Sequence, residues 1–145
     1  TALFPFDSVI VSTATTSHNL NTFLEAYEIK HKKRIYVDPI SKSVQSKFTL
    51  KNAVYTPGLS SLSELVKGIE KAYSRLGIGD KLVIFDQFDK LFAYHDTKTI
   101  TQFLDFLDKR MKLLKINNIF IMNLNKLNEK VSNHVNNISD KVINL

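Results

Sequence analysis

The stretch that decides the fold is Lys81–Asp86, which reads Lys-Leu-Val-Ile-Phe-Asp. Its four central residues are all apolar, and such a run is typical of a strand buried on both faces of a parallel sheet. Helical patterns precede and follow it in the sequence, so we expect helices to cover both faces. The terminal aspartate stands at the carboxyl end of the strand, where open α/β sheets bind their ligands.

Short apolar runs alternate with helical patterns along the rest of the chain. The predicted strands cover residues 8–12, 34–37, 53–55, 81–85, 118–122 and 141–145. This alternation favours right-handed crossovers and hence a mostly parallel sheet. We therefore predict one domain, residues 1–145, folded as a three-layer α/β/α sandwich around a mostly parallel central sheet.

The predicted helices have recognisable starts and stops. Ser17 is expected to cap a first helix that continues to Tyr27, because the apolar residues there recur at helical spacing. Ser61 and Glu64 form a capping-box pattern at the start of the next helix, and Gly77 ends it. Two more helices are expected around residues 100–114 and 127–135.

Composition excludes several classes of protein. The 145 residues are 43% hydrophobic and include no cysteine, which fits one globular domain without disulfides, thiolate metal sites or a cysteine nucleophile. The apolar runs are far shorter than the ~20 residues of a membrane span. No signal peptide is indicated either, so we expect a cytoplasmic domain. The four histidines are scattered without metal-ligand spacing, and we predict neither a metal site nor a catalytic residue.

The formal net charge of +6 permits contact with nucleic acid. The densest basic cluster comprises Lys30, Lys32, Lys33 and Arg34, between a predicted helix and a predicted strand. A solvated basic turn is the preferred interpretation of this cluster, and a nucleic-acid-binding surface is the alternative. We therefore expect any nucleic-acid binding by these residues to be weak.

The loop after the first strand lies where a phosphate-binding loop would lie. It is rich in hydroxyls, with Thr13, Thr15, Thr16 and Ser17 as candidate nucleotide contacts, but it has no glycine and no lysine. Free amides at the following helix N-terminus could still attract an anion. A capped turn is the alternative interpretation of the same residues.

Two aspartates stand at the ends of other predicted strands. Asp86 follows four apolar residues, which is the Walker B pattern, although an aspartate in this position also commonly accepts backbone amides of a turn. Asp38 ends the second strand just before Pro39, where it would serve as a base or simply precede the turn.

Several segments together resemble the RecA/KaiC-like family of P-loop ATPases, in a small archaeal branch of KaiC-related domains. The similar segments are Val9–Tyr27, Tyr55–Ser63, Leu82–Leu91, Phe103–Leu107 and Ile138–Leu145. The resemblance implies a RecA-like fold in which strand 118–122 separates the strand of the phosphate loop from the Walker B strand. It also implies that Asp86 orients magnesium and that the end of the second strand, here Asp38, supplies a catalytic acid.

The chain lacks residues that this family uses for catalysis. The Gly-Lys-Thr or Gly-Lys-Ser of the Walker A motif is missing from residues 13–18, and Asp38-Pro39 stands where active members usually carry glutamate. Phosphoryl transfer depends on the positioning and charge that this lysine and its loop supply. We therefore expect a non-catalytic pseudo-ATPase that acts as a protein-interaction or regulatory module, with a protein partner or homo-oligomer and without tightly bound ATP or magnesium. An ATPase completed by a neighbouring subunit and a weak nucleic-acid-binding module remain as alternatives.

Overall fold

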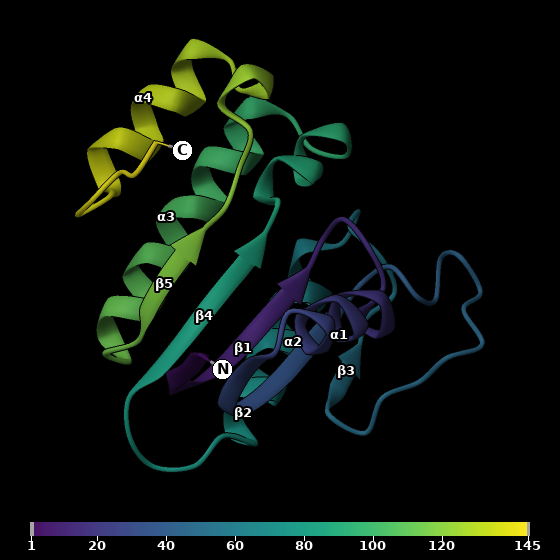
Figure 1. Cartoon of the computed structure of the whole chain (residues 1–145). Helices are drawn as coiled ribbons and strands as arrows, with labels where there is room; N and C mark the ends of the chain where they lie inside the picture. The colour runs from purple at the N-terminus through teal and green to yellow at the C-terminus, as the bar shows by residue number, and fades with distance from the viewer. Residues whose placement is uncertain (1, 145) are drawn as a thin grey trace.

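The structure is a computed structural model that describes residues 2–144, apart from the side chains of residues 2–5, 30–32 and 124. Strands, helices and two 3-10 turns alternate along the chain (Figure 1). The elements are β1 (Ala2–Ser12), α1 (Ser17–Ala26), β2 (Ile29–Asp38), β3 (Ala53–Tyr55), α2 (Leu62–Ser74), β4 (Lys81–Asp86), η1 (Phe88–Ala93), α3 (Thr97–Leu113), β5 (Asn117–Phe120), η2 (Leu124–Lys126) and α4 (Glu129–Ile138).

All the strands belong to one five-stranded parallel sheet with the order β3-β2-β1-β4-β5. The predicted α/β class with a parallel sheet is therefore confirmed, and β4 lies between β1 and β5 as an interior strand. The expectation that strand 118–122 separates the other two was wrong, because Val9 of β1 is directly opposite Val83 of β4. After β3 the chain crosses back through α2 and adds β4 on the free side of β1, so β5 becomes the outer strand.

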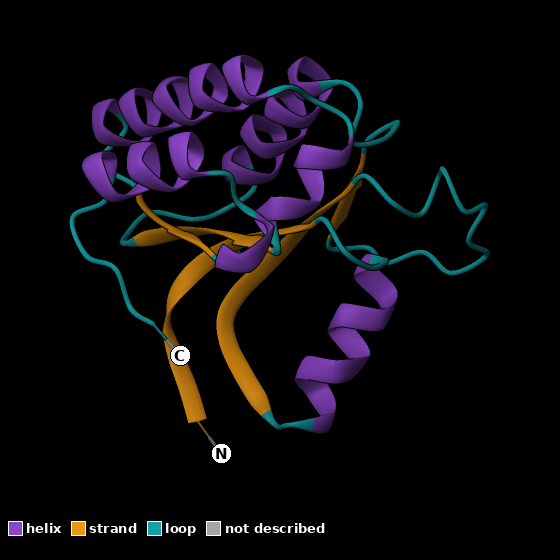
Figure 2. Ribbon diagram, turned by 90° about the horizontal axis from the view of Figure 1, so that it is seen from above, coloured by secondary structure: helices purple, strands orange, loops and turns teal. Residues whose placement is uncertain are grey.

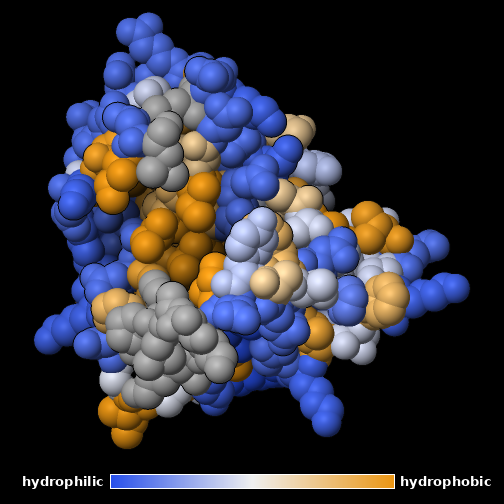
Figure 3. Space-filling view, viewed as in Figure 1, coloured by the Kyte–Doolittle hydropathy of each residue, from blue (hydrophilic) through white to orange (hydrophobic). Residues whose placement is uncertain are grey.

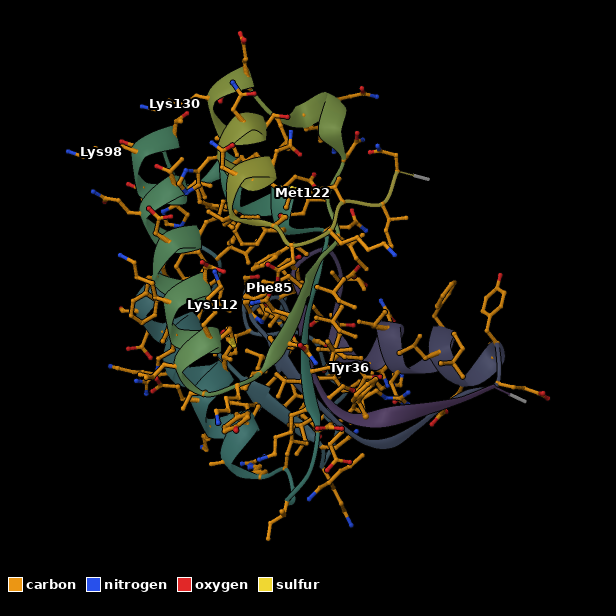
Figure 4. The ribbon with its side chains drawn as sticks, turned by 90° about the vertical axis from the view of Figure 1, so that its left-hand side faces the viewer. Tyr36, Phe85, Lys98, Lys112, Met122 and Lys130 are labelled. Atoms are coloured by element: carbon orange, nitrogen blue, oxygen red, sulfur yellow. The ribbon has the colours of Figure 1, made fainter. Side chains whose placement is uncertain are left out.

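Side chains alternate between the two faces of the sheet and build two separate apolar layers. Val9, Val11 and Phe85 belong to the larger core, which α2 and α3 cover. Ile10 and Tyr36 point to the opposite face and pack beneath α1. Figure 2 shows the helices on both sides of the sheet, and Figure 4 shows Phe85 and Tyr36 on opposite sides of it. The two layers explain why the interior strands are apolar at consecutive positions.

Helix starts are set by short polar side chains. In α1 the cap is Thr16 rather than the predicted Ser17, because the hydroxyl of Thr16 accepts the amide of Asn19 at 3.2 Å. In α2 the cap is Ser61, as predicted, and its hydroxyl accepts the amide of Glu64. The carboxylate of Glu64 pairs with Lys67 at 3.0 Å.

One glycine allows α2 to lie close to the sheet. A Cβ at Gly68 would come within 2.6 Å of Cγ2 of Thr56 and within 3.1 Å of Cγ1 of Val37. Distances this short are well inside van der Waals contact, so a side chain at this position would push the helix outward. Gly68 therefore fixes how deeply α2 seats on β2 and the end of β3.

A closing strand was predicted over residues 141–145. This prediction was wrong for residues 141–144, which are described and form no strand. Residue 145 lies outside the described residues. Val142 and Ile143 are 47% and 69% exposed. A four-residue run with two apolar side chains carries too little pattern to distinguish a strand from an extended tail. The outer edge of β5 is left without a neighbouring strand among the described residues.

Within residues 2–144 no helix combines the length and the apolar character that crossing a bilayer requires.

Candidate functional site

The candidate site is the edge of the sheet at the carboxyl ends of β1, β2 and β4, which lies at the top of the sheet in Figure 1. The strands that follow β1 in the sequence, β2 and β3, lie on one side of it, and the later strands β4 and β5 lie on its other side. The strand order therefore reverses direction at β1. Open α/β sheets bind ligands at this switch point. The sheet brings the loop after β1 together with Asp38 at the end of β2 and Asp86 at the end of β4.

Asp38 is fully buried and accepts five hydrogen bonds. Its Oδ2 accepts the amide of Ser17 at 2.7 Å and the hydroxyls of Ser17 and Ser41, each at 2.6 Å. Its Oδ1 accepts the amides of Ile40 at 2.9 Å and Ser41 at 2.8 Å. Burial by itself would raise the pKa of Asp38, but the hydrogen bonds from Ser17 and Ser41 stabilise the charged form and hold the pKa below its ordinary value of 3.8. The side chain is therefore an anion with its acceptor positions filled.

This carboxylate occupies the N-terminus of α1, which is the position where an anionic ligand would bind. The amide of Ser17 donates to Asp38, and the amide of Asn19 donates to the cap Thr16. Two of the first amides of the helix are thus used inside the protein. Thr16 and Ser17, both predicted as nucleotide contacts, serve this internal arrangement.

The hydroxyls of the other two candidate residues in this loop, Thr13 and Thr15, also make contacts within the protein. Thr13 is buried, and its hydroxyl contacts the backbone carbonyls of Asp86 and Gln87, the latter at 2.9 Å. The hydroxyl of Thr15 accepts the side-chain amide of Asn19 at 3.3 Å. These contacts close the loop against the end of β4 and the first turn of α1.

Asp86 differs from Asp38 because its half-buried carboxylate has no hydrogen-bond or ion-pair partner among the described residues. Burial, and secondly the nearby charge of Asp89, raise the pKa of Asp86. Asp89 itself accepts the amide of Asn123 at 3.0 Å and lies 3.9 Å from the ammonium of Lys126. No group of three or more acidic or histidine side chains within the described part of the chain is arranged to hold a metal ion.

The predicted basic cluster does not form a single surface in its described part. The ammonium of Lys33 donates to the carbonyl of Arg75 at 2.6 Å, at the end of α2. The guanidinium of Arg34 points to the other face of the sheet, beneath α1, where it donates to Asn21 at 2.9 Å and lies 5.5 Å from the ring centre of Tyr36. The side chains of Lys30 and Lys32 lie outside the described residues.

A loop with exposed lysines and an aromatic ring lies beside these strand ends, and its aromatic contact was not expected from the sequence. Residues 39–52, between β2 and β3, carry exposed lysines and the exposed Phe48, whose ring stacks on His18 of α1 at 4.3 Å. Residues 39–63 contain no acidic residue, and a long loop without acids was the signal that could have indicated this surface.

Part of the sheet is left open on the face that α1 covers. Ile84 of β4 and Ile119 of β5 are directly opposite each other, and Ile119 and Ile121 are 44% and 48% exposed. Figure 3 shows hydrophobic atoms gathered in a hollow on this face, over β4 and β5. Parallel sheets are normally covered on both faces, but no helix of the described residues covers this half of the face.

A small cavity lies toward the other end of the sheet, away from these carboxyl ends. It measures about 270 Å³ and opens between α2 and α3, with the ion pair Glu70–Arg110 at 3.2 Å among its lining residues. Most of its other lining side chains, such as Ile69 and Met111, are apolar, and none of the predicted site residues lines it.

Comparison of the chain with protein-family models, with curated proteins and with solved structures found no match.

Proposed function

We propose that this domain is a non-catalytic α/β module that binds another protein and does not hydrolyse ATP. The observation that carries the proposal is the position of the Asp38 carboxylate, which lies on the N-terminus of α1 where a phosphate group would have to bind. The proposal rests on this geometry. The RecA/KaiC resemblance points in the same direction through its missing Walker A residues, although it implied a different strand order.

The energetics of phosphate binding support this proposal. A nucleotide at α1 would have to displace Asp38 or bind beside its negative charge. The helix dipole and the remaining amides contribute about 1 kcal/mol at an exposed site. Micromolar affinity needs about 8 kcal/mol, so the loop after β1 falls far short without a lysine.

The open half of the sheet supports a protein partner. On the other half of the same face, α1 packs its apolar residues Leu20 and Leu24 against Ile10 and Tyr36. We infer that the partner supplies an equivalent apolar helix to Ile84, Ile119 and Ile121. A helix in this position would complete the third layer of the sandwich.

Calorimetry with Mg-ATP tests the first half of the proposal. We expect no turnover above background and at best millimolar affinity, with Asp86→Ala changing neither result. A micromolar dissociation constant that Asp86→Ala abolishes would overturn the proposal. Affinity that appears only at protein concentrations where the domain assembles would instead favour an ATPase site completed by a second subunit.

Binding of the amphipathic dye anilinonaphthalene sulfonate, which fluoresces on exposed apolar surface, tests whether this face is open to a partner. We expect dye fluorescence with the wild type and its loss in the double variant Ile119→Ser/Ile121→Ser. Ile143→Ser is the matched control, because Ile143 is equally apolar and 69% exposed but lies in the C-terminal segment. Equal loss of fluorescence in the control, or no loss in the double variant, would count against a docking face on β4 and β5.

A further inference from the structure

The loop of residues 39–52, here called the basic loop, projects from the carboxyl end of the sheet (Figures 1 and 2). It is longer than ordinary connections in compact domains, and loops of this length are commonly functional. Its first part is a compact turn in which the amide of Val44 donates to Ile40 at 3.1 Å and that of Ser46 donates to Ser41 at 2.9 Å. Near its end, the amide of Leu50 donates to the hydroxyl of Tyr55 at 2.8 Å. The loop is therefore a defined surface.

The surface of the basic loop carries positive and no negative side chains. Lys42, Lys47 and Lys51 are all exposed, and residues 39–63 contain no acid. The facing segment, residues 8–24, contains no acid either and adds His18. Asp38 beside the loop is buried and has its acceptor positions filled, and the other strand-end acid, Asp86, lies on β4, beyond β1. A polyanion that approaches the loop therefore meets mainly positive charge.

An aromatic ring is held among these lysines. The ring of Phe48 is stacked on His18 with 4.3 Å between ring centres and 9° between planes. The side chain is nevertheless 61% exposed, so the imidazole covers only part of it. Aromatic rings interleaved with lysines are the arrangement that binds single-stranded nucleic acids, because bases stack on the ring while ammonium groups contact phosphates.

We propose that the basic loop and His18 form a binding site for single-stranded nucleic acid. One base stacks on the open side of Phe48 and extends the His18–Phe48 stack, and the three lysines contact the flanking phosphates. An anionic lipid surface would also attract lysines, but Phe48 folds back onto α1 instead of projecting from the loop. This site lies apart from the β4–β5 face, so the proposal is independent of the proposed protein partner.

The test is fluorescence anisotropy with labelled oligo-dT and oligo-rU at low salt. Three phosphate contacts on a single strand predict a slope of about −2 in a plot of log affinity against log salt. Phe48→Leu keeps an apolar side chain but removes the stacking ring, and we expect it to weaken binding about fivefold or more. The triple variant Lys42→Gln/Lys47→Gln/Lys51→Gln should weaken binding and flatten the salt dependence.

The matched control changes the same charge elsewhere. Lys98→Gln/Lys109→Gln/Lys130→Gln removes three exposed lysines from α3 and α4, and Figure 4 shows Lys98 and Lys130 pointing outward from these helices. We expect this variant to bind as the wild type does. The proposal is overturned if the control weakens binding as much as the loop variant, or if Phe48→Leu binds normally. It is also overturned if the loop lysines promote binding to phosphatidylglycerol vesicles and not to oligonucleotides.

Discussion

The backbone nitrogen of Ser17 lies 2.7 Å from Oδ2 of Asp38, a residue 21 positions further along the chain. Through this contact the end of β2 supplies the anion that stabilises the start of α1. The same carboxylate also holds the first residues of the basic loop through the amides of Ile40 and Ser41. One buried side chain therefore joins a helix, a strand and a loop at the carboxyl edge of the sheet.

Replacement of this carboxylate should be costly. In Asp38→Ala the amides of Ser17, Ile40 and Ser41 lose a buried acceptor, and we expect the free energy of unfolding to fall by about 3–5 kcal/mol. Asp96→Ala is the matched control, because Asp96 caps α3 at an exposed site where a cap contributes about 1 kcal/mol. Urea unfolding measures both variants. Similar losses would show that Asp38 acts only as an ordinary cap.

Acid should weaken the hydrogen bonds that the Asp38 carboxylate accepts. Because the pKa of Asp38 is lower in the folded protein than its ordinary 3.8, its contribution to stability is complete above pH 3.8 and is lost as the pH falls from there through the folded-state pKa. The stability difference between the wild type and Asp38→Asn should therefore be constant near neutral pH and narrow below pH 3.8. Ser41→Ala, which removes one hydrogen bond, is the milder variant if Asp38→Asn does not fold. A difference that narrows above pH 5 would contradict a lowered pKa.

The close approach of α2 predicts an unusual response at Gly68. In an exposed helix, Gly→Ala is stabilising by about 1 kcal/mol. At Gly68 the new methyl group would overlap Cγ2 of Thr56, and overpacking of this kind costs about 1–3 kcal/mol. We expect Gly68→Ala to lower the thermal midpoint by about 2–12 °C. Thr56→Ser removes the methyl group that would overlap, so the double variant Gly68→Ala/Thr56→Ser should regain most of the lost thermal stability. If the effects of the two substitutions on the thermal midpoint simply add, this contact is not the cause.

Tyr36 should ionise only in strong alkali. Burial beneath α1 raises its pKa to about 12, although the positive charge of Arg34 opposes this shift and Glu25 adds to it. Tyrosinate absorbance of the wild type should show a transition near pH 12 that is absent in Tyr36→Phe. The same variant loses the hydrogen bond to Asn21 at 3.0 Å, at a cost of about 1 kcal/mol. A Tyr36 transition near pH 10 in the folded protein would show that the ring is not buried.

The parts of the fold that could be predicted are those with strong local patterns. Lys81–Asp86 was identified as an interior strand because burial on both faces demands consecutive apolar residues, and Val83 and Phe85 are indeed fully buried. The start of α2 was predictable because Ser61 is a favourable capping residue just before the helical pattern. The order of the strands was not predictable in this way, because it depends on which side of β1 the chain reaches after α2, and no local residue encodes that choice.

The convergence of the candidate residues could be predicted from the sequence, but their contacts could not. The loop after β1, Asp38 and Asp86 do converge at the carboxyl ends of the strands, as parallel topology requires. Nothing local to Asp38 shows that it accepts bonds from Ser17 in the preceding unit, because that contact exists only once β1 and β2 pair. The cap at Thr16 instead of Ser17 has a simpler cause: adjacent hydroxyl residues offer equivalent caps, and the backbone angles select one.

The basic loop is attached to the domain at its two ends, through Asp38 at the start and Tyr55 beyond the finish. Neither attachment involves residues 42–49, and the stacking of Phe48 on His18 is the principal contact of that central part with the rest of the chain among the described residues. The length and composition of the central part can therefore change without disturbing the sheet. The loop is the position where sequence drift, insertion or the grafting of a new recognition sequence would change what the domain binds while its architecture stays the same.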